Sequence, residues 1–588
     1  MRVRVLAVPR ANLKAQTSPR RVRLGARPPP AAGRGNATGE VALPNGRIFA
    51  PKKSSFYRGS PMVTCGRTCM RQMLTWFWTR RLGLAGCAMV LAFLVLAGRF
   101  WHPYYGFTKF LQIDEADARV AIPELRAAPV YFYSGQNGYD ASAYSQIAFH
   151  PGLDSPDLKT AVGNVPYRAR RILGSALAWL VAGGNPDRIA NAYATLNLAV
   201  WLGLAAVLWR LLPVRDWRGW LAWVGVLFSA GALHAVRLAL TDLLGLTLFA
   251  AAMLAQENRR ERPALGLLAL AGLARETALA GVVAFWRGPW LAPRTWIGNA
   301  VRTWIVIAPL GLWIAYIRWQ AGPADQGFGN FSWPGAGFVE KWFFALAGFR
   351  LDPAYGWLNA ATLLATLGLT VQAGFLVSRR LFNDAWWRVG AVGVVMMLLF
   401  GTSVWEGHPG AATRVLLPMG LAFAVLAVRQ RATWLWLVAG SLSVWSGVLA
   451  LWTVPQDAAE IAAGRSEHGA YVLRINEGWY GCERDRRNTW AWTAREGQLV
   501  LDTSPRGGSP ARVRLSLRAL APRTVEIRHG ARLLWSGPVG VNLQSIEFPV
   551  ERAGRVVLQL RSSETPVRES SAPGARALGF AVYNPRVE

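Results

Sequence analysis

The sequence is poor in cysteine, histidine and acidic residues. Its 588 residues include four Cys, six His and 33 Asp or Glu, against 65 Lys or Arg. Cys65 and Cys69 precede the first apolar run, where the chain is expected to be cytoplasmic and reduced. Neither a nearby His nor a second Cys pair completes a zinc site, and Cys482 has no obvious partner. These shortages argue against a disulfide framework and against a Cys/His metal centre.

Charged residues of any kind are scarce as well. They make up 17% of the chain, whereas 52% is hydrophobic and Trp occurs 29 times. This composition is typical of a polytopic membrane protein, in which Trp collects at the lipid–water boundary. The net charge of +32 could indicate nucleic acid, but the arginines lie between apolar runs and in the first 81 residues. The positive-inside rule explains them more simply, so a lipid bilayer is the expected partner and nucleic acid is not.

The N-terminal segment 1–81 is rich in Arg, Pro and Gly and contains one acidic residue, Glu40. That composition predicts disorder. The first apolar run, Leu82 to Gly98, follows Arg80 and Arg81, and no small-residue cleavage site comes after it. We therefore expect an uncleaved first helix with the N-terminus in the cytoplasm.

Residues 82–454 form the predicted membrane domain, because a span needs about 20 apolar residues. The fold class is a polytopic α-helical membrane protein with about 9–11 transmembrane helices, followed by an all-β domain. A shorter stretch, 172–184, is either an interfacial helix or a squeezed span. The runs that qualify are 82–99, 189–212, 220–236, 238–255, 303–319, 357–377, 388–404, 415–428 and 433–454.

The segment 263–286 is apolar except for Arg275 and Glu276 in its middle. It is either one span with a buried ion pair or a hairpin with these two residues at the turn. The hairpin keeps three later basic links inside, whereas a single span turns them outside, against the positive-inside rule. The hairpin is therefore predicted. Those links hold Arg287, Arg294 and Arg302; Arg379 and Arg380; and Arg429 and Arg431.

The same charge argument predicts which loops lie outside. They are the long first loop 100–188, the loop 320–356, the loop at Glu406 and everything after 454. Beyond about 470 the sequence alternates apolar and polar residues in short runs separated by Gly and Pro, which predicts about eight strands. Residues 470–588 are thus expected to form an extracytoplasmic β-sandwich.

The stretch GYDASAYSQIAFHP, Gly138 to Pro151, contains one carboxylate, Asp140. A carboxylate beside a membrane surface can act as general base for an incoming hydroxyl. The arginines of the run 167–171 could hold a phosphate group bidentately. The structural alternative is that Asp140 caps a helix starting at Ala141, because Asp is a favoured N-cap residue.

Several blocks together resemble the GT-C superfamily of integral-membrane glycosyltransferases, which use polyprenyl-phosphate-linked sugars. The first is GYDASAYSQIAFHP, followed by VPYRARRILGSALAWLVAGG and a span containing Asn197. The others are LTDLLGLTLFAAAMLA, LAGLARETALA and WEGHPGAATRVLLPMGLAF. The resemblance covers roughly 82–454. The β domain is similar to sandwich modules appended to bacterial glycosyltransferases.

The resemblance implies that Asp140, the acid of the first outer loop, is the catalytic base or orients the acceptor. The chain departs from the family pattern at Ala141, at Ser142-Ala143 and at His150, which bears on acceptor contacts. The residues expected to bind substrate are Tyr139, Tyr144, Arg168, Arg171, Asp242, Arg275, Glu276, Glu406 and Arg414. A structural ion pair with Arg237 is an equal alternative to substrate binding for Asp242. For Arg275 and Glu276 the alternative is a structural ion pair with each other at the hairpin tip.

The predicted function is transfer of a hexose or pentose from a polyprenyl-phosphate donor to an extracytoplasmic glycan or lipid acceptor. The rivals are a transporter or flippase of lipid-linked glycans, and a non-catalytic envelope protein whose β domain binds polysaccharide. No cofactor is predicted; a divalent metal stays an option, with Asp114 and Glu115 as weak ligands. A bacterial inner membrane suits the basic start and the absence of eukaryotic targeting signals.

Overall fold

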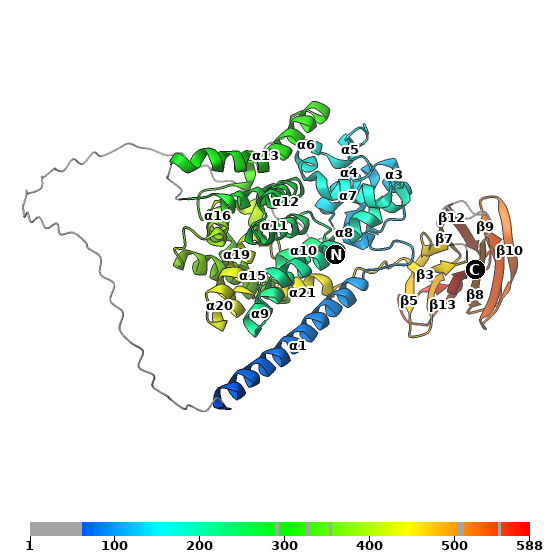
Figure 1. Cartoon of the computed structure of the whole chain (residues 1–588). Coiled ribbons are helices and arrows are strands. Elements are labelled where there is room, and N and C mark those ends of the chain that lie inside the picture. Colours follow the sequence, from blue (N-terminus) through cyan, green and yellow to red (C-terminus); the bar gives the residue numbers. More distant parts are fainter. Residues whose placement is uncertain are drawn as a thin grey trace, which may run out of the picture. The chain divides into compact units, whose positions relative to one another are not determined.

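The computed structural model describes residues 62–588, apart from 136, 289–292, 324–327, 352–355, 468, 504–510 and 551–553. Most of the segment predicted to be disordered, 1–61, lies outside the described residues. Helix α1 runs from Met62 to Gly98 and is drawn as one long blue helix in Figure 1. It includes residues 62–81, which composition had assigned to the disordered segment, because this stretch contains no Pro and extends the apolar helix backwards.

A series of short elements fills the predicted first loop between α1 and α8. Strands β1 and β2 pair in parallel, Ile113 with Phe132. The elements are η1 (Thr108–Phe110), β1 (Ile113–Asp114), α2 (Glu115–Val120), α3 (Pro123–Ala127), β2 (Phe132–Tyr133), α4 (Asp140–Ile147), α5 (Leu158–Val162), α6 (Val165–Arg168), η2 (Ala169–Arg171) and α7 (Ile172–Ala182).

The remaining helices pack together (Figure 1), and most of them contribute to one hydrophobic core. In chain order they are α8 (Pro186–Leu211), α9 (Trp217–Leu227), α10 (Ala230–Arg237), α11 (Asp242–Glu257), α12 (Glu261–Ala274), η3 (Glu276–Phe285), α13 (Pro293–Ala321), η4 (Phe328–Asn330), α14 (Ala336–Leu351), α15 (Gly356–Ser378), α16 (Ala385–Leu399), α17 (Thr402–Trp405), α18 (Ala412–Val415), α19 (Leu417–Arg429), α20 (Trp434–Gly440) and α21 (Val444–Trp452).

Among the described residues, six helical segments are long and apolar enough to cross a membrane, and each coincides with a predicted run. They are Arg80–Gly98, Pro186–Leu211, Trp217–Arg237, Pro293–Ala321, Gly356–Ser378 and Trp434–Trp452. The other three predicted runs form α11, α16 and α19, of 16, 15 and 13 residues. At 1.5 Å per residue these helices are about 20–24 Å long, short of a ~30 Å hydrocarbon core. Helix α19 is buried along almost its whole length, so protein surrounds it.

The segment 263–286 folds as the predicted hairpin. Helix α12 ends at Ala274, Arg275 is extended, and the 3₁₀ helix η3 runs back beside α12. The far end of η3 returns to the end of α11, because Gln256 Nε2 donates to the carbonyl oxygen of Ala284 at 2.8 Å. Asp242 and Arg275 therefore lie at one end of these helices, and Gln256 and Glu261 at the other.

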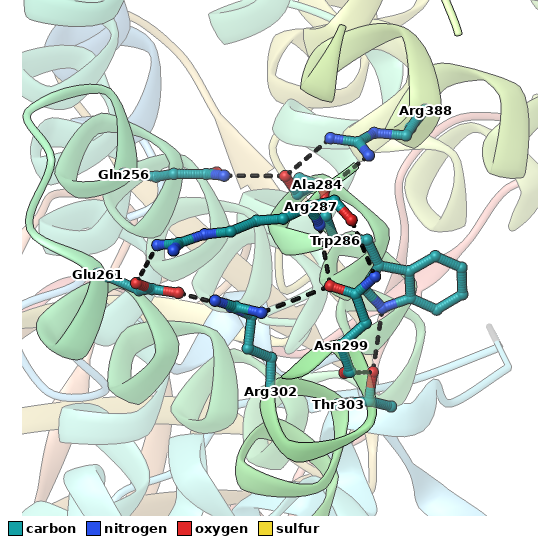
Figure 2. A network of polar contacts seen from close by, with 9 residues as sticks. All are labelled: Gln256, Glu261, Ala284, Trp286, Arg287, Asn299, Arg302, Thr303 and Arg388. Carbon is teal, nitrogen blue, oxygen red and sulfur yellow. Dashed lines mark hydrogen bonds and ion pairs between the residues drawn. The ribbon is translucent and has the colours of Figure 1, made fainter. Parts of the chain in front are cut away.

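Figure 2 shows the polar contacts at that second end, which we call the Glu261 network. Glu261 pairs with Arg287 and with Arg302, whose Nε lies 2.6 Å from Oε1. The buried Arg388 donates to the carbonyl oxygens of Ala284 and Trp286, at 3.3 and 2.8 Å. These carbonyls lie at the end of η3, so Arg388 caps it. The network consists of Gln256, Glu261, Ala284, Trp286, Arg287, Asn299, Arg302, Thr303 and Arg388.

The C-terminal part is a two-sheet sandwich, as predicted. The sheets have the orders β10-β9-β12-β7-β4-β3 and β11-β8-β15-β6-β5, and their inward residues share one apolar core. The strands are β3 (Glu460–Ser466), β4 (Gly469–Ile475), β5 (Trp479–Arg484), β6 (Thr489–Thr493), β7 (Glu496–Thr503), β8 (Ala511–Ala519), β9 (Arg523–His529), β10 (Arg532–Val539), β11 (Gln544–Val550), β12 (Arg555–Arg561), β13 (Val567–Arg568), β14 (Ala577–Leu578) and β15 (Phe580–Val587).

The sandwich begins earlier than the predicted boundary at 470 and has more strands than the eight expected. Strand β3, EIAAGRS, starts at Glu460. Its small residues hide the apolar–polar alternation on which the prediction relied. It is the edge strand of its sheet and pairs with β4 on one side.

Candidate functional site

The site is built around the start of α4. The preceding residue, Tyr139, is the extended N-cap residue, and Asp140 is the first residue of the helix. The interpretation of Asp140 as an N-cap is therefore wrong by one position. As a first-turn acid, Asp140 interacts favourably with the helix dipole. Its side chain is 42% exposed and lies 3.8 Å from Arg168 Nη2, so it is accessible to a substrate hydroxyl.

The backbone before Asp140 is fixed by Asp114. Its two carboxylate oxygens accept from the backbone N–H groups of Asp117 and Gly138, at 2.7 and 2.8 Å. These hydrogen bonds lower the pKa of the Asp114 carboxyl. A Cβ at Gly138 would lie 2.5 Å from Asp117 Oδ2, so a larger residue there would displace the Asp117 side chain. Asp114 is thus a positioning residue, which the sequence had offered only as a weak metal ligand.

A buried carboxylate, Asp242, lies between two arginines. Arg275 Nε is 3.1 Å from its Oδ1, and Arg414 Nη1 is 3.4 Å from its Oδ2. Arg414 also donates through Nη2 to the hydroxyl of Tyr139 at 2.7 Å. Because Tyr139 directly precedes Asp140, these contacts connect the exposed carboxylate of Asp140 to the buried ion pairs of Asp242.

The alternative pairing of Asp242 with Arg237 is wrong. Arg237 Nη2 donates to the hydroxyl of Tyr133 at 3.2 Å, and its guanidinium lies over the ring of Phe100. Helix α10 ends at Arg237 and α11 begins at Asp242, with the backbone of Ala239 left-handed between them. This break sends the two side chains in different directions. Asn197 holds it by donating to the carbonyl oxygens of Ala235 and Leu240.

Arg275 and Glu276 do not form an ion pair with each other either. Arg275 pairs with Asp242, whereas Glu276 Oε2 accepts from Arg171 Nε at 2.9 Å. Arg171 also donates to the hydroxyl of Tyr144, and burial raises the pKa of Tyr144 to about 12. The extended backbone at Arg275 lets neighbouring residues point to different partners. The hairpin turn thus joins α4 and η2 to Asp242.

Nine of the ten predicted site residues therefore come together, in what we call the Asp242 cluster. Its members are Tyr139, Asp140, Tyr144, Arg168, Arg171, Asp242, Arg275, Glu276 and Arg414. Its four guanidinium groups face three carboxylates, which leaves one positive charge in excess. An excess of guanidinium groups suits an anionic ligand such as phosphate.

Exposure separates the members that can meet a substrate from those that cannot. The side chains of Asp140 and Arg168 are 42% and 35% exposed, whereas those of Arg414 and Asp242 are 7% and 2% exposed. Arg414 and Arg171 are buried, and each already donates through two nitrogens to protein partners. The solvent-exposed part of the cluster therefore consists of one carboxylate and one guanidinium, Asp140 and Arg168. The ion pairs of Asp242 are buried behind them.

Glu406 lies apart from the cluster. Its exposed side chain lines a separate pocket together with Lys341 and Trp405, and none of the cluster residues lines that pocket. Among the described residues, no group of three His, Cys, Asp or Glu side chains is placed to hold a metal ion. Asp114 directs both its oxygens to backbone N–H groups, so the weak metal option at Asp114 and Glu115 finds no support.

Sequence reasoning missed Tyr167 and Tyr193. The guanidinium groups of Arg170 and Arg171 lie over the ring of Tyr167, at 5.5 and 5.4 Å from its centroid. Tyr193, on α8, is buried near Tyr144 and the carboxylates of the cluster. The run 167–171 begins with Tyr167 and could have identified it. Nothing in the sequence around Tyr193 distinguishes it from other aromatic residues of a membrane helix.

Fold and site together define a protein with apolar membrane helices, a C-terminal β-sandwich and a charged cluster at one end of its helices. No protein-family model and no curated protein matches the chain. A solved structure that matches is "Single-Particle Cryo-EM Structure of Arabinosyltransferase EmbB from Mycobacterium smegmatis", at 12% identity and a TM-score of 0.16. The match covers 70% of this chain and 59% of that one, less than two thirds of its length. A likeness this loose supports no functional assignment, which has to rest on the contacts of the cluster.

Proposed function

We propose that the protein is a membrane glycosyltransferase that moves a sugar from a polyprenyl-phosphate donor to an extracytoplasmic glycan or lipid acceptor. The observation that supports this most is the exposed carboxylate of Asp140 beside Arg168, held from below by Tyr139, Arg414 and Asp242. A base must reach the proton that it abstracts, and Asp140 is the most exposed of the three carboxylates in the cluster.

In the proposed reaction, Asp140 takes the proton of the acceptor hydroxyl. The acceptor oxygen forms a bond to the anomeric carbon while the bond from that carbon to the phosphate oxygen breaks. The phosphate leaves with the electron pair, so the anomeric configuration inverts. Arg168 is the exposed arginine of the cluster, and in the described part of the chain Arg275 contacts Asp242 through Nε alone. We assign the phosphate to these two, and their fixed charge stabilises the leaving group.

The distribution of arginines supports an extracytoplasmic position for the Asp242 cluster. The Glu261 network and its surroundings hold Arg287, Arg302, Arg388 and Arg429, and the positive-inside rule assigns such an end to the cytoplasm. The Asp242 cluster lies at the other end of α11 and α12. It would then face the extracytoplasmic side, where lipid-linked sugars are presented; a bacterial inner membrane is part of this proposal.

The direct test uses membranes that contain the protein and a panel of radiolabelled polyprenyl-phosphate sugars. Transfer by the wild type that is lost in Asp140→Asn at equal protein level supports the proposal. The matched control is Asp157→Asn, which changes an exposed residue of the same loop whose side chain forms no capping hydrogen bond. Transfer that Asp140→Asn leaves intact would contradict the assignment of the base. Labelled lipid that crosses the membrane without transfer would instead support a flippase.

A further inference from the structure

A second pocket lies in the part of the chain where sequence reasoning placed only Glu406. Its volume is about 210 Å³, which is room for several waters. Helix α14 contributes Glu340, Lys341 and Phe344, and the segment from α17 onward contributes Trp405 and Glu406. This space is too large for a single ion and suits one small ring.

Lys341 is a buried cation in the wall of this pocket. The residue is 3% exposed, and one of its three N–H donors goes to the carbonyl oxygen of Gly407 at 2.7 Å. Among the described residues no carboxylate forms an ion pair with it, and burial lowers the pKa of Lys341 to about 8. It is also the only lysine in the sequence after Lys159. A buried ammonium with donors to spare calls for oxygen acceptors from a ligand.

Trp405 gives a second, independent sign of a ligand. The residue is 2% exposed, and its indole Nε1 is a buried donor without a hydrogen-bond partner among the described residues. Buried indole N–H groups usually have a partner. A water or a ligand group in the pocket could accept from this donor.

The acceptors and the charge of the pocket narrow the class of ligand. Glu340 accepts from the Thr402 hydroxyl at 2.5 Å, and Glu406 is exposed in the same lining. These two carboxylates outnumber the single ammonium of Lys341, so the pocket disfavours an anion such as phosphate. Phe344 is 46% exposed; the Lys341 ammonium lies over its ring at 5.2 Å from the centroid, and the remaining exposed part of the ring is open to a ligand. Carboxylates that accept, an ammonium and an indole that donate, and one aromatic face suit the hydroxyls and the ring of a neutral sugar.

We propose that this pocket binds one neutral sugar unit, and that in the full reaction it holds a residue of the acceptor glycan. The second half of this inference rests on the proposed function, while the first half does not. The loop that carries Glu406 leads within eight residues of the chain to Arg414 of the Asp242 cluster. A sugar in the pocket would thus lie against a segment that also orders the start of α4.

The test uses the full-length protein in lipid nanodiscs and saturation-transfer NMR with methyl glycosides of common pentoses and hexoses. We expect at least one glycoside to bind, and Trp405→Phe, which removes the indole N–H, to weaken binding about three- to tenfold. Lys341→Met and Glu406→Gln should weaken it by a similar factor. The matched controls, Lys159→Met and Trp434→Phe, change an exposed lysine and an exposed tryptophan and should leave binding unchanged.

The outcomes separate this inference from the proposed function. Asp140→Asn should abolish sugar transfer yet keep glycoside binding. Glycosides that bind the wild type and the three pocket variants equally would overturn the pocket, even if transfer is observed. No binding of any glycoside, or tighter binding of inorganic phosphate than of glycosides, would overturn it as well. Binding that follows the pocket variants, in a protein that transfers no sugar, would keep the sugar site and reject the enzyme.

Discussion

The two ends of the hairpin formed by α12 and η3 both gather arginines, but they use them differently. In the Glu261 network, Arg388 caps carbonyls at the end of η3, and Arg302 pairs with the partly exposed Glu261 (Figure 2). In the Asp242 cluster, Arg275 and Arg414 bracket a carboxylate that is 2% exposed. The first end uses its arginines to complete the fold, and the second fixes charge beneath an exposed carboxylate.

This contrast indicates where function can reside in a bundle of apolar helices. Charged groups that satisfy helix ends and each other leave no capacity for a ligand. In the Asp242 cluster, by contrast, the exposed carboxylate of Asp140 is joined to a buried ion-pair core through Tyr139. Equivalent substitutions at the two ends should therefore have different effects. The largest difference is expected in the free energy of unfolding, and smaller differences in sugar transfer and donor binding.

Removing the buried charge should destabilise the fold far more than removing its counterpart at the other end. Asp242→Asn leaves Arg275 and Arg414 without their carboxylate, and breaking a buried pair costs about 3–5 kcal/mol of unfolding free energy. Glu261→Gln removes an acid that is 37% exposed, where about 0–1 kcal/mol is expected. Thermal unfolding of both variants in detergent measures the difference. Equal losses would contradict the contrast between the two ends.

The contact between Arg414 and Tyr139 should position Asp140. Arg414→Lys and Tyr139→Phe each remove the hydrogen bond between the guanidinium and the phenol hydroxyl, and each should slow transfer about tenfold, or ~1.4 kcal/mol. Because both act through one bond, the double variant should be no slower than the slower single variant. Arg302→Lys in the Glu261 network is the control and should leave the rate unchanged. If the fold-reduction in rate of the double variant equals the product of the two single reductions, the two residues act separately.

Arg168 should contribute to donor binding. It is the more exposed of the two arginines proposed to hold phosphate, so Arg168→Gln should raise the KM for the donor about three- to tenfold. Arg188→Gln removes an exposed arginine at the start of α8 and should not change it. The measurement is the KM for the donor at saturating acceptor. A changed KM for the acceptor alone would move Arg168 to the other substrate.

The second pocket allows a separate prediction, a pH dependence at Lys341. Burial lowers the pKa of Lys341 to about 8, whereas a lysine in the unfolded chain titrates near ~10.4. Between these values the unfolded chain binds the proton that the folded chain has lost, so stability rises with pH. The nearby His408 stays neutral in this range because burial lowers its pKa.

The measurement is the melting temperature of the wild type and of Lys341→Met as a function of pH. The wild type should gain about 2–4 °C on the variant from about pH 7.5 to about pH 10. Parallel pH profiles of the two proteins would reject a buried, destabilised ammonium.

Much of this arrangement follows from the sequence through charge and length. The basic links after α12 predict the hairpin, which brings Arg275 to the end of the helices where Asp242 and Arg414 lie. The alternation after Glu496 predicts the sandwich. Which partner each charge takes could not be predicted, because pairing depends on local backbone breaks. The left-handed Ala239 and the extended Arg275 redirect side chains that lie close together in the chain.

Other features could not be predicted because they depend on contacts between residues that are far apart in the sequence. Asp114 accepts from the backbone N–H of Gly138, 24 residues away, and Lys341 and Trp405 meet in one pocket from segments far apart in sequence. Strand β3 escaped because its small residues carry no alternation. Residue type, together with the resemblance to a known family, therefore pointed to the charged members of the Asp242 cluster, while the residues that hold them in place required the fold.

The role of Asp140 is tested most sharply by the single-turnover rate of sugar transfer at saturating polyprenyl-phosphate donor, for the wild type and Asp140→Asn. Loss of a general base should lower the rate about 10²–10⁴-fold, with unchanged unfolding temperature and donor binding. If the variant transfers sugar at the rate of the wild type, the exposed carboxylate has no part in the chemical step and the proposed mechanism is wrong.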